Sequence, residues 1–392
     1  MTLDLKKLTL LVCLIVAIIL GVTGVYKYGP SSLVEQDAAV TESGRFADPS
    51  LKYVAVIFRH GDRTPVFSYK TDINANAFPE EKGDLTKKGK QHMYQKGKFF
   101  RRLYNGFISD LYLDSEIIIK TTKMKRTFMS AALVLAGMYP PKDYQKWSEL
   151  ETVWQPIPIS NDSPENISLY DSKKTCPSLY KEVQKVFPKL KSRENEPQIS
   201  ELLSYLSEKC GKQITTENLP LLYDLFLSQM ANGLQLPEWI KPNHIQTIES
   251  IVSSKEILRF IYLNKKIQTL YIAPLLKEIS LNMELRSNDS NLKSTRKMHL
   301  YSGHDNTVMT ASGYLHSDII GSVYFGASLH FHLYFDNTNG YTIKLFYYGR
   351  WDDEKGEEVP IPSCGNPCKL QDFTTFINEI FSPEWGKECQ DV

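Results

Sequence analysis

Three groups of charged or titratable residues follow apolar runs in this chain. The first is the segment Arg59–Arg63, in which His60 stands between two arginines directly after the apolar run 54–58. A run rich in β-branched residues is typical of a buried parallel strand, and the glycine after His60 indicates a loop. Ligands of open α/β sheets bind at the carboxyl ends of strands. Two arginine forks around one imidazole suit an anionic, tetrahedral group, with phosphate as the first candidate.

Two further strand-like segments end in residues of the same kind. His304 and Asp305 follow the run 298–302, and Lys120 follows the run 116–119. Parallel strands bring their carboxyl ends to one edge of a sheet, so we expect the three groups to meet there. Taken singly, each segment is also compatible with a polar turn held by local ion pairs. Three strand ends that deliver such groups together favour an anion site.

The motif R-H-G-D-R-T-P over residues 59–65, followed far along the chain by H-D, resembles the signature of the histidine acid phosphatases, branch 2 of the histidine phosphatase superfamily. Residues 85–89 are similar to the family's L-T-x-x-G, and residues 126–131 to its R-T-x-x-S-A. The resemblance extends from about Lys52 to Cys389 and is strongest to secreted animal acid phosphatases of the prostatic and insect-venom types. It implies an α/β fold with a mostly parallel central sheet flanked by helices, and a smaller, mainly helical inserted domain.

By this resemblance, His60 is the nucleophile that forms a phosphohistidine, and Asp305 is the proton donor to the leaving group. A neutral imidazole attacks phosphorus well, and a covalent intermediate divides one displacement into two easier ones. A carboxylic acid donates only while it is protonated, so we expect an acidic working pH. No cofactor and no metal is implied, because guanidinium groups supply the electrostatic stabilisation. The residues implied to bind the phosphate are Arg59, Arg63, His304 and Lys120.

Lys120 stands where the family carries an arginine that holds the phosphate. Lysine keeps the charge but lacks the planar fork that binds two oxygens at once. Loss of one aligned clamp costs on the order of 10²-fold in rate. Two hypotheses follow: a secreted acid phosphatase that hydrolyses small phosphate monoesters, or a weakened or inactive secreted relative that binds phosphate ligands. The other site residues are intact, which favours the enzyme.

Charge and residue pattern bear on four alternatives: a nucleic-acid partner, an inositol polyphosphate substrate, a metal site and a homodimer. The 46 basic and 45 acidic residues leave a net charge of +1, so no nucleic-acid partner is predicted. Hydrolysis of inositol polyphosphates, a third hypothesis, requires a strongly basic pocket, whereas residues 181–196 mix lysines with glutamates. His330 and His332 could form a metal pair, but their alternation with apolar residues is more typical of an ordinary strand face. A homodimer is left open.

An apolar amino-terminal segment indicates the secretory pathway. Residues 8–25 are almost entirely apolar and follow Lys6 and Lys7, as in a signal peptide or a signal anchor. We therefore expect residues 1–28 to be that segment, residues 29–51 to be a flexible lead-in, and the protein to be secreted. A lysosomal location and a retained type II membrane anchor are the alternatives. Contact with a membrane is expected only if the segment is retained.

The cysteines agree with an oxidising compartment. By resemblance, Cys176 pairs with Cys389 and Cys364 pairs with Cys368, which leaves Cys210 over, as a free thiol or with an intermolecular bridge as the alternative. Sequons of the Asn-x-Ser type become meaningful once a chain enters the secretory pathway. Glycosylation is expected at Asn166 and Asn288.

The order of apolar patterns predicts a split domain. Residues 52–160 and 264–392 are expected to form the α/β catalytic domain, and residues 161–263 the helical insertion. Near the carboxyl end, residues 329–335 and 341–348 alternate apolar and polar side chains around a turn rich in Asp, Asn and Gly. This pattern predicts a β-hairpin.

Overall fold

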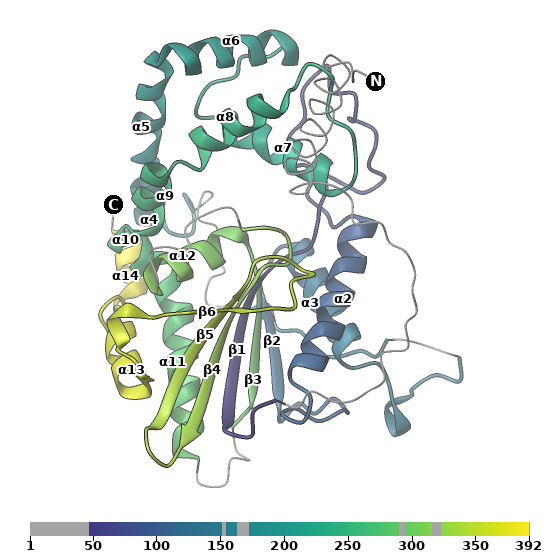
Figure 1. Cartoon of the computed structure of the whole chain (residues 1–392), viewed down its shortest axis with the longest axis vertical. Helices are drawn as coiled ribbons and strands as arrows, with labels where there is room; N and C mark the ends of the chain where they lie inside the picture. The colour runs from purple at the N-terminus through teal and green to yellow at the C-terminus, as the bar shows by residue number, and fades with distance from the viewer. Residues whose placement is uncertain (1–46, 151–153, 163–171, 290–294, 316–322, 392) are drawn as a thin grey trace, which may run out of the picture.

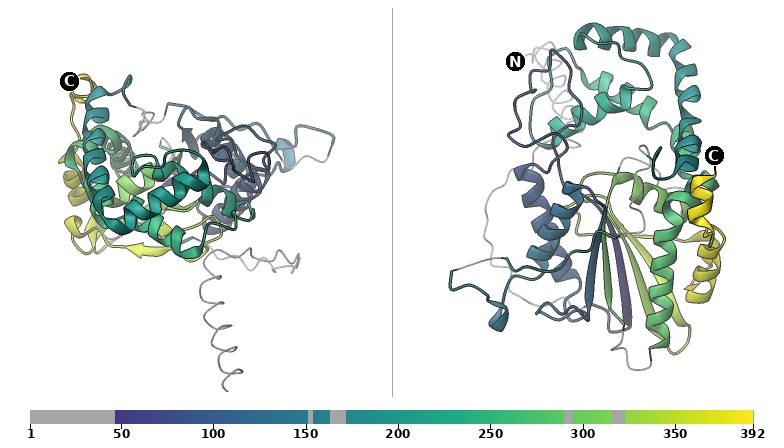
Figure 2. Two further views of the ribbon diagram at one scale, coloured as in Figure 1. Left: turned by 90° about the horizontal axis from the view of Figure 1, so that it is seen from above. Right: turned by 180° about the vertical axis from the view of Figure 1, so that it is seen from behind.

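The computed structural model of the chain describes residues 47–150, 154–162, 172–289, 295–315 and 323–391. In these ranges a twisted central sheet carries helices on both faces, and a further group of helices lies beyond one end of the sheet (Figure 1). The rear view in Figure 2 shows the same arrangement. The predicted α/β fold with a central sheet flanked by helices is therefore confirmed.

The sheet has seven strands within the described residues, in the order β2-β3-β1-β4-β5-β6, with β7 paired to β5. β1 lies in the interior of this order, and its residues 53–58 have no exposed surface. A strand buried on both faces requires such a continuous apolar run. The strands are β1 Leu51–Arg59, β2 Ile117–Thr121, β3 Met298–Gly303, β4 Ser328–Asp336, β5 Gly340–Tyr348, β6 Glu357–Val359 and β7 Cys368–Lys369.

β1, β2 and β3 run parallel and end at the same edge of the sheet. Arg59 of β1 pairs with Gly303 of β3, and Thr121 of β2 pairs with Ser302. These are the three strands that the sequence predicted from its apolar runs. The residues that follow these three strands along the chain therefore lie next to one another at this edge.

The sheet is mixed, which corrects the prediction of a mostly parallel sheet. β4 and β5 form the predicted hairpin, and β4 pairs antiparallel with β1. β6 and β7 pair antiparallel with β5. Gly340 closes the hairpin turn at a φ of 70°, a left-handed conformation that glycine adopts at little cost. The first six residues of β4 are buried, so this strand takes an interior place in the sheet beside β1.

Two helices, α2 (Lys87–Leu103) and α3 (Lys125–Met138), cover one face of the sheet (Figure 1). They approach so closely that a Cβ atom on Gly97 would lie 2.1 Å from the backbone oxygen of Val134. Their apolar side chains join those of β1, β2 and β3 in one buried cluster. This packing fixes the amino-terminal end of α3 relative to the strand ends.

The opposite face is covered by α11 (Ala273–Asn288), α12 (Asp305–Leu315) and α13 (Leu370–Asn378) (Figure 1). Their apolar side chains share a second buried cluster with the other face of β1, β4 and β5. α12 begins immediately after β3. Its first turn therefore lies at the edge where the parallel strands end.

Helices between residues 177 and 262 make up the group beyond the end of the sheet (Figure 1). The apolar faces of α6, α7 and α8 form a third buried cluster, to which Tyr69 contributes from the segment after β1. The described part of the predicted insertion is thus helical, whereas its boundaries at residues 161–263 stay a prediction. These and the remaining α-helices are α4 Pro177–Gln184, α5 Val186–Ser192, α6 Pro197–Cys210, α7 Leu219–Ala231, α8 Pro242–Val252, α9 Lys255–Tyr262, α10 Lys265–Ile267 and α14 Trp385–Gln390.

Both expected disulfides are present in the structure. Cys176 is bonded to Cys389 and Cys364 to Cys368. Cys210 is a buried free thiol whose pKa is raised to about 12 by burial, so it is unreactive as a thiolate.

Several expectations concern parts of the chain outside the described residues. The segment 1–28, most of the lead-in and Asn166 lie there, whereas Asn288 is exposed at the end of α11. Within the described ranges, none of the helices is both long enough and apolar enough to cross a membrane.

Candidate active site

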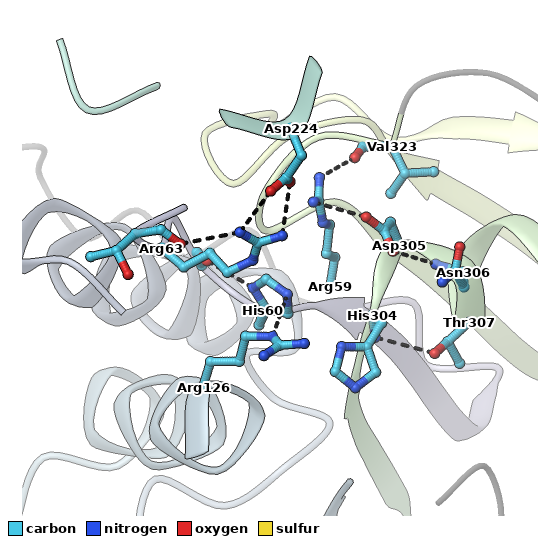
Figure 3. Close-up of polar contacts among 12 residues, drawn as sticks. Arg59, His60, Arg63, Arg126, Asp224, His304, Asp305, Asn306, Thr307 and Val323 are labelled. Atoms are coloured by element: carbon cyan, nitrogen blue, oxygen red, sulfur yellow. Dashed lines mark hydrogen bonds and ion pairs between the residues drawn. The ribbon is translucent and has the colours of Figure 1, made fainter. Parts of the chain in front are cut away.

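The structure brings the three predicted strand ends together at one edge of the sheet (Figure 3). Arg59 ends β1, and His60 and Arg63 lie in the loop that follows. His304 and Asp305 connect β3 to α12. The ring centroids of His60 and His304 are 5.6 Å apart. Residues separated by about 240 positions in the sequence therefore form one cluster.

Hydrogen bonds fix the tautomer of His60. Its Nδ1 lies 2.9 Å from the backbone oxygen of Gly61, which can only accept, so Nδ1 carries the proton. Nε2 is then unprotonated, and it accepts a hydrogen bond of 3.1 Å from Nε of Arg126. Burial, followed by the charges of Arg126 and Arg59, lowers the pKa of His60 well below its ordinary value. The imidazole is therefore neutral, with a lone pair on Nε2 that can act as a nucleophile.

The loop that carries His60 lies tightly against α2 and α3. The N–H of Gly61 donates to Oγ of Ser130 at 3.1 Å. A Cβ atom at Gly61 would lie 2.6 Å from Cγ of Met93 and 2.7 Å from the backbone oxygen of Gly89. Only glycine fits at this position without displacing a neighbour. The close packing of this loop against α2 therefore requires a glycine after His60.

Arg59 and Arg63 are held in place through their terminal nitrogens, yet Nε of each has no acceptor among the described residues. Nη1 of Arg59 donates to the backbone oxygen of Val323, and Nη2 pairs with Oδ2 of Asp305 at 2.9 Å. Both terminal nitrogens of Arg63 are bound by the carboxylate of Asp224. Nε of each arginine is buried and has no hydrogen-bond acceptor among the described residues. Because a buried, unpaired donor is costly, two of them in one cluster indicate a place for an anionic acceptor.

Arg126 is a third guanidinium of this cluster, and the sequence reasoning assigned it no role. It lies in the first turn of α3, and its Nε donates to Nε2 of His60 (Figure 3). Burial, followed by the charge of Arg63, lowers the pKa of Arg126 to about 10, so the group stays cationic at neutral and acidic pH. The sequence feature that could have pointed to Arg126 is the R-T-x-x-S-A segment, in which it is the arginine and which begins shortly after β2 ends.

His304 is oriented by two threonines. Its Nε2 lies 3.0 Å from Oγ1 of Thr122, and its backbone N–H donates to Oγ1 of Thr307 at 3.1 Å. Burial, followed by the charge of Arg126, lowers the pKa of His304 to about 4. The ring is therefore neutral near neutral pH and carries one N–H that it can donate. Thr122 follows β2, so this hydroxyl is the contribution of β2 to the cluster.

Asp305 begins α12 and is the carboxylate of the predicted proton donor. Its Oδ1 accepts the backbone N–H of Asn306 at 2.8 Å, and its Oδ2 pairs with Arg59. Burial raises the pKa of Asp305, but the charges of Arg59 and then His304 outweigh burial and lower it below its ordinary value. The side chain remains 37% exposed, so water or a leaving group can reach it.

Lys120 lies apart from the cluster. Side chains alternate between the faces of a strand, and Lys120 falls on the face of β2 that meets α11. Its Nζ pairs with Glu278 of α11 at 3.1 Å and approaches Asp162 at 3.9 Å. Glu278 also accepts a hydrogen bond from the hydroxyl of Tyr301. These contacts give no support to the predicted role of Lys120 in binding phosphate; the cation that lies against His60 is Arg126.

Asp224 joins the cluster from the helical group. It lies on α7, and its Oδ1 and Oδ2 accept hydrogen bonds from Nη2 and Nη1 of Arg63 at 2.8 and 3.1 Å. A fork-to-fork pair of this kind fixes the guanidinium in one plane. Nothing in the local sequence around Asp224 indicated this contact, because the two residues are 161 positions apart.

The paired histidines of β4 are part of the sheet and not of the cluster. His330 and His332 are both buried, and both are hydrogen-bonded to the hydroxyl of Tyr104. Burial lowers the pKa of His332 to about 3 and holds that of His330 well below its ordinary value, so both rings are neutral. These contacts agree with the strand-face interpretation. Among the residues that the structure describes, no three His, Cys, Asp or Glu side chains are grouped as metal ligands.

Comparison with known protein families matches residues 50–348 to the histidine phosphatase superfamily, branch 2. The lysosomal acid phosphatase of Homo sapiens is 30% identical over 352 residues, which cover 87% of this chain and 80% of that protein. The prostatic acid phosphatase of Mus musculus is 29% identical over 363 residues, which cover 86% of this chain and 89% of that protein.

Solved structures of bacterial phytases share the fold. The Hafnia alvei phytase in complex with tartrate superposes with a TM-score of 0.63 at 15% identity, over 86% of this chain and 99% of that one. The phytase of Citrobacter braakii gives a TM-score of 0.57 at 16% identity, over 88% of this chain and 100% of that one. The match over residues 50–348 and the 30% identity to the lysosomal acid phosphatase show that the chain belongs to branch 2 of the histidine phosphatase superfamily, in the histidine acid phosphatase family.

Proposed function

We propose that this protein is an acid phosphatase that hydrolyses phosphate monoesters through a phosphohistidine on His60. The observation that carries the proposal is the environment of that ring. Its Nε2 is unprotonated and lies against Arg126, while Arg59 and Arg63 each keep a buried Nε without an acceptor. A phosphoryl group bound to Nε2 would supply oxygens to all three guanidinium groups. Charge on those oxygens is what a phosphoryl-transfer site must stabilise.

In the first step, Nε2 of His60 attacks phosphorus and the bond from phosphorus to the ester oxygen breaks. The leaving oxygen takes a proton from the carboxyl group of Asp305, so an alcohol departs and Asp305 becomes a carboxylate. Nδ1 of His60 keeps its proton, held by the backbone oxygen of Gly61. In the second step, a water molecule attacks the phosphohistidine and gives its proton to Asp305. Inorganic phosphate leaves, and both residues return to their starting states.

The proton on Asp305 has to be supplied, because Arg59 lowers the pKa of this carboxyl in the resting state. A phosphate ester bound against Arg59 brings negative charge to the same guanidinium. That charge opposes the effect of Arg59 and raises the pKa of Asp305 when substrate is bound. Acidic pH then increases the protonated fraction further. We therefore propose an acidic optimum, with the protonated carboxyl as the working form in the enzyme–substrate complex.

The weakened phosphate-binding relative is the second candidate, and it rested on the replacement of arginine by Lys120. The pairing of Lys120 with Glu278 takes this side chain away from His60. Arg126 nevertheless provides a third guanidinium at 3.1 Å from the attacking nitrogen. A complete set of three guanidinium groups supports turnover, and we therefore prefer the enzyme.

We propose that the protein works outside the cytosol, with residues 1–28 directing it into the secretory pathway. The two disulfides support an oxidising compartment, and the relatives include lysosomal and prostatic enzymes. Expression of the full chain in animal cells, followed by assay of medium, lysosomal fraction and membranes, tests this. Activity confined to the cytosol would contradict it.

The enzymatic proposal is tested by hydrolysis of an aryl phosphate whose ring carries no charge, over a range of pH and with a metal chelator present. Wild type should be active at acidic pH and unaffected by the chelator. His60→Ala should lose activity, because it removes the unprotonated Nε2 that lies against Arg126. His244→Ala is a matched control, since this histidine lies on α8 and caps its own helix. Activity in correctly folded His60→Ala equal to wild type would refute the proposal.

A further inference from the structure

We propose that Asp224 of α7 determines specificity by excluding phosphate esters whose leaving group carries additional negative charge. The substrates selected would be monoesters of neutral or cationic alcohols. This inference rests on the proposed phosphatase function, which it refines. It concerns a residue of the helical group rather than of the sheet edge that bears His60.

The contact of Asp224 with Arg63 places a fixed carboxylate in the site. Its two oxygens bind both terminal nitrogens of Arg63, at 2.8 and 3.1 Å. The side chain of Arg63 is 9% exposed and that of Asp224 is 23% exposed. The carboxylate is therefore anchored by the arginine on one side and still partly open on the other. Figure 3 shows it extending from the insertion toward Arg63 and Arg59.

Asp224 leaves room for the phosphoryl group on the same arginine. Nε of Arg63 is buried and has no acceptor among the described residues, so this N–H stays available when Asp224 holds both terminal nitrogens. A phosphoryl oxygen can accept from Nε while Asp224 keeps its two hydrogen bonds. Asp224 then stays in place during turnover as a permanent negative charge beside the bound phosphate.

The field of Asp224 reaches the same groups as that of Asp305. Both carboxylates act electrostatically on Arg59 and on Arg126. Asp305 has to contact the leaving oxygen, so the leaving group must lie near this pair of carboxylates. A further phosphate or carboxylate on the leaving group would be repelled there, and an ammonium group would be attracted.

The lysines in the first turns of α3 and α2 are held by partners other than Asp224. Nζ of Lys125, in the first turn of α3, pairs with Glu81 at 3.0 Å and lies 3.9 Å from Asp84. Nζ of Lys88, in the first turn of α2, donates to the backbone oxygen of Ala231. Among basic residues of the insertion, Lys185 and Arg193 pair with glutamates of their own segments.

The test uses three aryl monophosphates that differ in one ring substituent: a carboxylate, a neutral group and a trimethylammonium group. kcat/KM is measured for wild type, for Asp224→Asn and for Glu201→Gln. Glu201 is an exposed carboxylate on α6 and serves as the control for loss of one charge in the insertion. Intrinsic differences among the esters cancel when their ratios are compared between variants. Loss of orientation of Arg63 lowers all three rates together and also cancels.

Asp224→Asn should raise kcat/KM of the anionic ester relative to the neutral one by about five- to tenfold, the Coulomb effect expected for charges roughly 7 Å apart in partly screened surroundings. The cationic ester should lose a similar factor. Glu201→Gln should leave both ratios unchanged. Independently of any variant, the preference of wild type for the neutral over the anionic ester should diminish as salt is raised.

Unchanged ratios in Asp224→Asn, with the neutral ester still hydrolysed, would overturn the role of Asp224 and leave the phosphatase proposal standing. Absence of hydrolysis of all three esters by wild type would instead refute the phosphatase proposal. Calorimetric binding of inositol hexakisphosphate needs no turnover and keeps the inference testable in that case. Binding should be weak in wild type and tighter in Asp224→Asn; equal affinity in both would overturn it.

Discussion

Replacement of Arg126 should impair catalysis far more than replacement of Lys120. Arg126 donates from Nε to the attacking nitrogen of His60 at 3.1 Å, whereas Lys120 pairs with Glu278 on the opposite side of β2. When phosphorus bonds to that nitrogen, the guanidinium of Arg126 lies beside the phosphoryl oxygens. The family motif instead assigns phosphate binding to position 120. Variants at these two positions therefore distinguish the role inferred from the structure from the role inferred from the motif.

The expected magnitudes follow from the contacts. Removal of one aligned donor to a developing oxyanion costs about 10²–10³-fold in kcat, so Arg126→Ala should fall in that range. Arg126→Lys retains the charge and loses one charge-assisted hydrogen bond of about 1.5–3 kcal/mol, which corresponds to roughly 10- to 100-fold. Lys120→Met breaks a mostly buried ion pair with Glu278, at a cost of about 1.5–3 kcal/mol in stability, with kcat within about threefold of wild type.

The assay measures kcat at acidic pH for an aryl phosphate whose ring carries no charge. A thermal unfolding curve is recorded for each variant. Arg296→Ala is a matched control, because this arginine pairs with Asp114 just before β3, at the opposite end of the sheet. Lys120→Arg is included and should leave kcat unchanged. A loss of about 100-fold in folded Lys120→Met, with wild-type kcat in Arg126→Ala, would refute the reasoning.

Two further predictions concern protons. Asp305→Asn should reduce kcat/KM of an alkyl phosphate by about 10²–10⁴-fold and that of a nitrophenyl phosphate much less, because only a poor leaving group needs the proton; equal losses for both esters would contradict the role of Asp305. Burial lowers the pKa of His299 to about 3, so the folded protein holds this ring neutral while the unfolded chain protonates below about pH 6.5. Stability contributed by the neutral ring is therefore lost as pH falls through this window, by about 2 kcal/mol at pH 5. His299→Phe should reduce the difference in unfolding free energy between about pH 7 and pH 5 by that amount, as measured by urea denaturation; an unchanged difference would contradict it.

Much of the candidate site at the sheet edge could be predicted because it depends on local patterns. The apolar run before Arg59 specifies a buried strand, and the runs before His304 and Lys120 specify two more. Three parallel strands must end at a common edge, so their following residues meet whatever the rest of the chain does. The hairpin of β4 and β5 was predicted for the same reason, from alternation and turn residues.

The rest depended on contacts that sequence spacing does not encode. The side on which Lys120 falls is decided by the register of β2 and by the carboxylate of Glu278 on α11, more than 150 positions away. Asp224 meets Arg63 only once the helical group is placed beyond the sheet edge. The antiparallel pairing of β4 with β1 was missed because the burial of β4 became evident only with its partners present.

The most direct test of the central claim is to trap the phosphorylated enzyme. Wild type is mixed with an aryl phosphate labelled on phosphorus, quenched in alkali within the first turnovers, digested and analysed by mass spectrometry. We predict a phosphoryl group on the peptide that contains His60, and we expect acid treatment to remove it. The corresponding peptide of His60→Ala should carry no phosphoryl group. Rapid turnover with no labelled peptide, or a label on another residue, would contradict the claim that His60 is the nucleophile.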